Sequence, residues 1–129
     1  MHGSEPTPSL DPNALVVTLE HDERHTRTLV RRPLDGDLSA WEGVKANAVL
    51  VSTVRLPVAF VHPRQRWETM AFPVYFREGH MDVNYGEVAC RHAADREGAE
   101  RNHTEVVREF SEGPSDRDPV TGVQYGDLT

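Results

Sequence analysis

The sequence predicts an α+β fold, in which a C-terminal helix covers one face of a mainly antiparallel sheet of three to five strands. Short runs of β-branched and aromatic residues recur along the first two thirds of the chain. After residue 95 the apolar spacing becomes helical. Since 129 residues have room for one core, we expect a single domain over residues 14–111. A disordered arm over residues 1–13 would precede it, and an extended or disordered tail over residues 112–129 would follow.

Two runs after the arm predict a β-hairpin. Residues 14–20 are mostly β-branched and apolar, and residues 25–33 are rich in Thr and Val. The charged residues 21–24 lie between them and form the expected turn. Further along, the Asp-Gly pair at residues 35–36 predicts a turn, and residues 38–42 predict one short helical turn.

The strongest strand signal covers residues 47–61, where most apolar side chains are β-branched or aromatic. Pro57 ends the regular pairing or marks a sheet edge. The side chains divide between two faces, Val49, Val51, Thr53 and Arg55 on one and Leu50, Ser52, Val54 and Leu56 on the other. Because the second set is more apolar, we expect it to face the core.

Two further strands and a helix complete the predicted domain. Residues 67–76 and 87–92 alternate between two faces, and a turn-rich loop joins them. Asp95 caps the helix, and the Gly-Pro pair after Glu112 ends it. The apolar stripe of this helix consists of Ala99, His103, Val106, Val107 and Phe110.

The formal net charge of −7 argues against a general affinity for nucleic-acid backbones or anionic membranes, which require a positive field. The charge is uneven, because residues 55–76 hold three Arg and one acid, whereas residues 78–129 hold twelve acids and five Arg. No apolar run is long enough to span a membrane, and no signal-peptide pattern opens the chain. A lone Cys90 forms no internal disulfide.

A resemblance follows from the order of three motifs. Residues 51–54 (VSTV) are followed by residues 67–72 (WETMAF), a strand, and a helix with His103 in the pattern A-x-x-x-H-x-x-V-V. This order resembles a group of small proteins of actinobacteria and their phages that has no assigned activity. The resemblance implies an α+β fold and a location in the host cytoplasm or the virion. This chain departs from the group in having Asn102 where the group has Gly, and in lacking the Leu-Asp-His loop after the first motif.

Two histidine patterns are candidates for metal binding. His21 and His25 have a spacing that puts two imidazoles on one face of a helix, although their place between two strands favours a solvated hairpin loop. Cys90 and His92 share one face of a strand and would form a zinc site or a thiolate–imidazole pair if His103 approached them. A structural Cys and a core His are the alternative interpretation.

The candidate binding residues are Arg64, Arg66, Trp67, Glu68 and His103. Residues 62–67 combine basic side chains with an aromatic ring, as phosphate-contacting segments do, or form a connecting loop whose Arg residues meet the acidic helix. Glu68 is expected to be an exposed residue of its strand or to form an ion pair with Arg64, Arg66 or Arg91. A catalytic acid would need a second carboxylate, and the sequence offers no such pair.

No catalytic residue and no cofactor are expected. The sequence favours a non-enzymatic accessory or structural protein of phage or mobile-element type, which acts through contacts with a protein partner, either virion components or a second copy of itself. A small metal-dependent or Cys/His enzyme or regulator is one alternative. The other is an inhibitor of a nucleic-acid enzyme that acts through the acidic C-terminal third.

Overall fold

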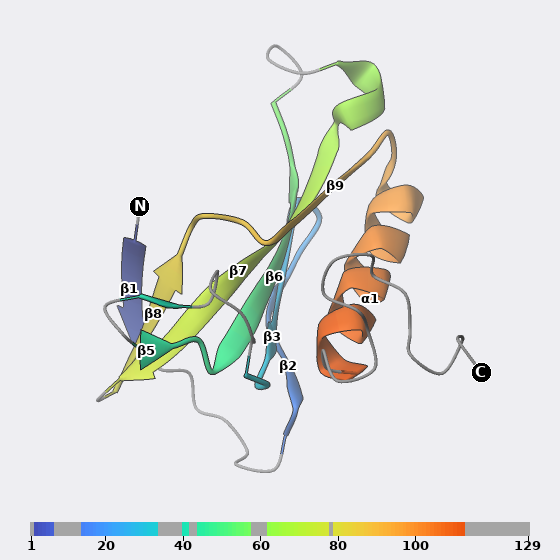
Figure 1. The fold of residues 1–129 in the computed structure, drawn as a ribbon. Helices are drawn as coiled ribbons and strands as arrows, with labels where there is room; N and C mark the ends of the chain where they lie inside the picture. The colour runs from blue at the N-terminus through green and yellow to red at the C-terminus, as the bar shows by residue number, and fades with distance from the viewer. Residues whose placement is uncertain are drawn as a thin grey trace, which may run out of the picture.

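The computed structural model describes residues 2–6, 14–33, 40–41, 44–57, 62–77 and 79–112 (Figure 1). Helix α1 covers Arg96–Glu112, and a short 3-10 helix, η3, covers Pro63–Gln65. Strands β4 (Ala40–Trp41) and β5 (Val44–Lys45) pair with each other apart from the main sheet. The seven strands of the main sheet are β1 (His2–Pro6), β2 (Val16–His21), β3 (His25–Val30), β6 (Ala48–Arg55), β7 (Trp67–Arg77), β8 (His80–Asn84) and β9 (Ala89–Ala93).

The main sheet runs in the order β1-β8-β7-β6-β3-β2, and every pair in it is antiparallel. The long strand β7 pairs with β6 along one side. On its other side, β7 pairs with β9 over Trp67–Ala71 and with β8 over Val74–Arg77. The predicted fold class is therefore confirmed, but three to five strands is too few.

Helix α1 packs on one face of this sheet, and both faces of the central strands are buried (Figure 1). On the helix side, Val49, Val51 and Ala71 pack against Val106 of α1. On the other side lies a second cluster, formed by Leu29, Ala48, Leu50, Phe72, Val74, Met81 and Val83. The prediction that the Leu50 face of β6 is the one that faces the core was incomplete, because Val49 and Val51 on the opposite face are buried as well, under α1.

The edge strand β1 was missed. Residues 2–6 belong to the segment predicted as a disordered arm, but they pair with β8 along its whole length. Gly3 makes this approach feasible, since a Cβ atom there would lie 2.8 Å from a ring carbon of Tyr85. The Ser and Pro content that suggested disorder is tolerated at a sheet edge. The rest of the arm and the tail after Glu112 lie outside the described residues.

Two other local predictions were wrong. Residues 80–84 were placed in a loop but form β8, where Met81 and Val83 are buried between more exposed neighbours. Residues 38–42 were predicted as a helical turn, whereas Ala40–Trp41 forms strand β4. Both strands are short and pair with a strand adjacent in sequence, β4 with β5 and β8 with β7, so their pairing outweighs the local turn signals. The turn at residues 35–36 lies outside the described part of the chain.

Helix α1 agrees with its prediction. The Asp95 side chain caps it, because Oδ1 accepts a hydrogen bond of 2.8 Å from the Gly98 amide. Ala99 and Val106 of the apolar stripe are buried, and the other three members are half-buried. No helix in the described part of the chain is long and apolar enough to cross a membrane.

Candidate functional site

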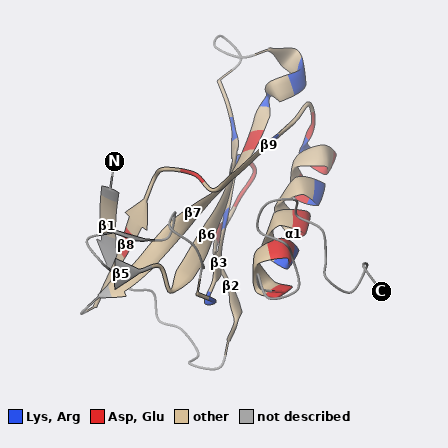
Figure 2. Cartoon of the chain, in the orientation of Figure 1, with Lys and Arg blue, Asp and Glu red and all other residues tan. Residues whose placement is uncertain are grey.

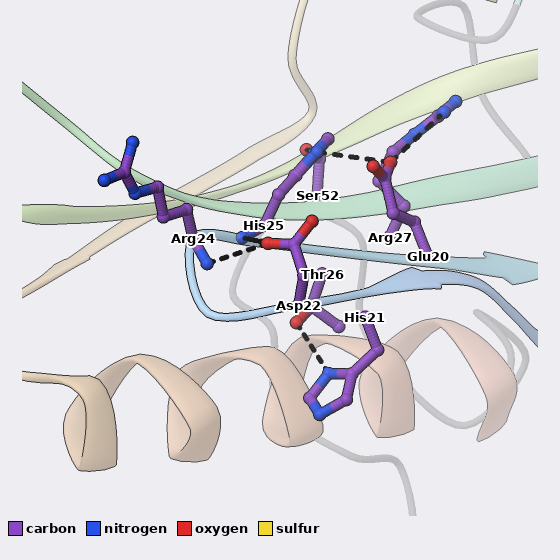
Figure 3. A network of polar contacts seen from close by, with 8 residues as sticks. All are labelled: Glu20, His21, Asp22, Arg24, His25, Thr26, Arg27 and Ser52. Carbon is purple, nitrogen blue, oxygen red and sulfur yellow. Dashed lines mark hydrogen bonds and ion pairs between the residues drawn. The ribbon is translucent and has the colours of Figure 1, made fainter.

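The β2–β3 hairpin ends in a turn that the Asp22 side chain organises (Figure 3). Its Oδ1 accepts hydrogen bonds of 2.8 Å from the backbone amides of Arg24 and His25. The bond from the Arg24 amide is the main cause that lowers the pKa of Asp22. The predicted hairpin loop is confirmed.

The two histidines of this hairpin face opposite sides of the sheet (Figure 3). His21 shares a hydrogen bond of 3.0 Å with the Thr26 hydroxyl on the helix side. His25 contacts the Ser52 hydroxyl at 3.1 Å and the Glu20 carboxylate at 3.3 Å on the other side. They therefore form no metal site together.

His103 of α1 sits between two threonine hydroxyls of the sheet. Its Nε2 lies 2.7 Å from Thr28 Oγ1, and its Nδ1 lies 2.7 Å from Thr53 Oγ1, which is 2.8 Å from Thr69 Oγ1. Burial, and secondarily the charge of His21, lowers the pKa of His103 to about 4. A neutral imidazole has one donor and one acceptor nitrogen, so both are satisfied. His103 is thus a structural residue of the helix–sheet interface.

Cys90 and His92 lie on the face of β9 that points away from α1. Arg91, between them, points toward the helix and pairs with Glu105 at 2.7 Å and Glu109 at 2.5 Å. Since side chains alternate along a strand, Cys90 and His92 lie on the far face. They therefore do not converge with His103, which is on the helix side.

The structure brings Glu68 to Cys90 and His92 instead. Glu68 is the register partner of His92, and its Oε2 lies 3.1 Å from His92 Nε2. One carboxylate oxygen, the thiol sulfur and one ring nitrogen all lie within 4.8 Å of one another. Burial raises the pKa of the Cys90 thiol, and the charges of Glu68 and Glu87 add to this effect. The sequence did not reveal this grouping, because it depends on the register between β7 and β9.

Two adjoining cavities lie where the hairpin turn meets the first turns of α1. The first has a volume of about 360 Å³ and is lined by His21, Asp22, Thr26, Thr53, Trp67, Arg96, Ala99, Glu100, His103 and Thr104. The second, of about 330 Å³, is lined by Glu23, Arg55, Arg66, Trp67, Ala94 and Arg96. Trp67 and Arg96 line both cavities.

The candidate binding residues are thus distributed over different places. Arg66 and Trp67 line the second cavity, and Trp67 and His103 line the first. Arg64 lies exposed in η3 and lines neither, while Glu68 belongs to the far face. Sequence reasoning missed Arg55 and Arg96, whose only signal was their position at the end of a strand and at the start of a helix.

Comparisons with protein-family models, curated proteins and solved structures find no match for this chain. The geometry of the described residues is therefore the basis of the proposals below.

The lowered pKa of His103 predicts how the free energy of unfolding depends on pH. In the unfolded chain this group takes up a proton near pH 6.5, whereas the folded chain resists protonation down to about pH 4. The contribution of His103 is therefore complete above pH 6.5 and is lost as the pH falls toward 4. We expect His103→Gln to cost about 1–3 kcal/mol at neutral pH. The difference in unfolding free energy between wild type and variant should shrink in acid.

Urea unfolding of both proteins at neutral pH and at about pH 4.5 measures this effect. The variant His80→Gln, at an exposed position on β8, is the matched control and should keep the wild-type pH dependence. A wild-type advantage over His103→Gln of the same size at both pH values would contradict the assignment.

Proposed function

We propose that this chain is a non-enzymatic accessory or structural protein that acts through protein–protein contacts. The open edge of strand β2 carries this proposal. In the described part of the chain no strand pairs with the outer side of β2, and Leu15 just before it and Val16 at its start are 40 % and 42 % exposed. Open edges with exposed apolar side chains are sites where another strand adds to a sheet. A phage or mobile-element setting is supported by the sequence resemblance.

The backbone of β2 indicates which groups face outward. The Leu15 carbonyl accepts a hydrogen bond of 2.7 Å from the Arg31 amide, so Leu15 is bonded toward β3. Because bonded and non-bonded residues alternate along an antiparallel pair, Val17 also bonds inward. The amides and carbonyls of Val16 and Thr18 therefore point toward the open edge.

The partner that fits this edge is a second copy of the same chain. Residues 15–19 (LVVTL) are uncharged and nearly symmetric about Val17. Two copies can pair antiparallel with their Val17 residues opposite each other. The amide and carbonyl of each Val16 would then form hydrogen bonds with the carbonyl and amide of Thr18 in the other copy. The closed two-fold contact then joins uncharged residues, so no like charges oppose each other. The β-bulge between Thr18 and Glu20 limits the contact to this segment.

A second candidate function rests on Glu68, Cys90 and His92. Thiolate, imidazole and carboxylate ligands suit Zn²⁺, and three protein ligands leave a fourth position for water. Tetrahedral zinc separates such ligand atoms by about 3.3–3.6 Å. The 3.1 Å between Glu68 and His92 is already close to this, and small side-chain rotations would bring in Cys90 from its present position. This candidate corresponds to a zinc-dependent regulator.

The acids of α1 give little support to the inhibitor alternative. Glu105 and Glu109 are paired with Arg91. At about 100° per residue, Arg101 and Arg108 project between the directions of Glu97 and Glu105. Figure 2 shows both signs of charge along this helix. The described acids thus form no single negative surface.

The edge proposal predicts self-association that depends on the outward amides of β2. Light scattering over a concentration series should show wild-type dimers that dissociate on dilution. Thr18→Pro removes one outward amide and should shift the dimer toward monomer by about tenfold or more in dissociation constant, since Pro is tolerated on an edge strand.

The control is Thr18→Ala, which keeps the amide and should dimerise like the wild type. A wild-type protein that stays monomeric throughout the series, or a Thr18→Pro variant that dimerises as well as Thr18→Ala, would contradict pairing through this edge.

The zinc candidate predicts one equivalent of metal per chain. Purified wild-type protein dialysed against excess zinc should retain it, as measured by elemental analysis, while Cys90→Ser and Glu68→Gln should each bind it at least tenfold more weakly. His80→Gln is the control, because His80 lies outside the cluster. Equal zinc retention by Cys90→Ser and the wild type would rule out this site.

A further inference from the structure

We propose that the cavity between the hairpin turn and the start of α1 binds the phosphate group of a small phosphomonoester. This cavity, the second one described above, brings together three arginines from three different elements. Arg55 ends β6, Arg66 precedes β7 and Arg96 begins α1. Guanidinium groups match the oxygens of phosphate through paired hydrogen bonds. Binding of this ligand would involve neither the open edge of β2 nor the group formed by Glu68, Cys90 and His92.

The lining is net positive, which favours an anion. Three arginines contribute three positive charges and Glu23 one negative charge, which leaves a balance of +2. A phosphomonoester carries about −1.5 to −2 at neutral pH, whereas a carboxylate carries one charge. Among the described residues no carboxylate pairs with Arg55 or Arg66, and Arg96 contacts only Glu100, at 3.2 Å. The guanidinium groups of Arg55 and Arg66 are thus available to a ligand.

The Nε atom of Arg66, a residue that lines the cavity, is an unpaired donor. It is buried and has no hydrogen-bond acceptor among the described residues. Buried charged donors nearly always have a partner, because leaving one unpaired is costly. Arg66 is also held in place, since its carbonyl accepts a hydrogen bond of 2.8 Å from the Leu56 amide. Because this atom is covered by protein, a phosphate oxygen in the cavity would become its acceptor only when the Arg66 side chain turns on binding.

The frame of the cavity is fixed by the strands around it. Arg55 and Trp67 are register partners between β6 and β7, and Trp67 pairs in turn with Ala93 of β9. The Arg55 amide donates to the Arg24 carbonyl at 2.9 Å, which holds the hairpin turn and Glu23 beside β6. The positive end of the α1 dipole adds to the field. The Gly98 amide already donates its hydrogen bond to the Asp95 side chain. The arginine side chains are therefore the main donors to a phosphate in this cavity.

The neighbouring cavity suggests where the rest of the ligand lies. Its volume of about 360 Å³ is within the range of small-molecule sites, and Trp67 and Arg96 form walls common to both spaces. Thr26, Thr53 and Thr104 line it with hydroxyls, and Ala99 is apolar. An organic group attached to the phosphate would therefore pass Trp67 and enter a mixed polar and apolar space.

Calorimetric titration of the intact chain at low ionic strength tests the proposal, with inorganic phosphate, phenyl phosphate and benzoate as probes. Phenyl phosphate should bind at least tenfold more tightly than inorganic phosphate, because its ring adds a contact at Trp67. Benzoate, with one charge, should bind more weakly than phenyl phosphate by a similar factor. The Arg66 Nε–H resonance should shift on saturation with phenyl phosphate.

The variants separate this cavity from the general surface charge. Arg66→Gln and Arg55→Gln should each weaken phenyl phosphate binding about tenfold or more, and Glu23→Gln should tighten it. Arg55 is exposed, so its replacement keeps the test decisive if Arg66→Gln fails to fold. Arg64→Gln is the matched control, because Arg64 is exposed and lines neither cavity.

Three results would overturn the proposal. The first is the absence of saturable binding of any probe. The second is an Arg64→Gln variant that weakens binding as much as Arg66→Gln, which would indicate nonspecific attraction. The third is phenyl phosphate that binds no more tightly than inorganic phosphate, which would exclude the neighbouring cavity as the place of the organic group.

Discussion

His103 connects helix α1 to the sheet through the hydroxyls of Thr28 and Thr53, and Thr69 extends this contact to a third strand. Leaving a buried ring nitrogen unpaired is costly, so the two hydrogen bonds of His103 favour this rotation and position of the helix. The Arg91 pairs with Glu105 and Glu109 fix the same helix from β9. Together these contacts place the start of α1 against the hairpin turn, and the two cavities lie in that junction.

This arrangement separates structural polar groups from those available for binding. The histidine with the largest change in pKa is used in the core, where it serves the packing of α1. The groups that remain accessible lie at the margins: the outer edge of β2, the Glu68 cluster on the far face, and the arginines at the end of β6 and the start of α1. The proposed contacts use these accessible groups.

The sequence predicted those elements whose signal is local. The helix followed from Asp95 and its apolar stripe, and β7 followed from strict alternation over residues 67–76. Strand β8 was missed because two buried residues, Met81 and Val83, lie among turn formers, and β1 because its partner is eighty residues away in sequence at Asn84. Strand pairing outweighs local preference in both cases, with the adjacent strand β7 for β8 and with the distant strand β8 for β1.

The sites were predicted less well, since they depend on which strands are neighbours. Arg66, Trp67 and the pair Cys90 and His92 were recognised as candidates from residue type. Their true neighbours, Arg55 and Arg96 for the cavity and Glu68 for the cluster, depend on the register of β6, β7 and β9. The same register places His103 on the opposite face from Cys90, so a grouping based on residue type alone joined residues that the sheet separates.

The most direct test of this account is the protonation state of the His103 ring in the folded protein. Nitrogen NMR of ¹⁵N-histidine-labelled protein, with His103→Gln for assignment, distinguishes a neutral ring from an imidazolium. The account predicts one protonated and one unprotonated ring nitrogen from neutral pH down to about pH 5, since the pKa of His103 is lowered to about 4. A ring that becomes doubly protonated near pH 6.5 in the folded protein would contradict the buried position on which the placement of the helix and of the two cavities depends.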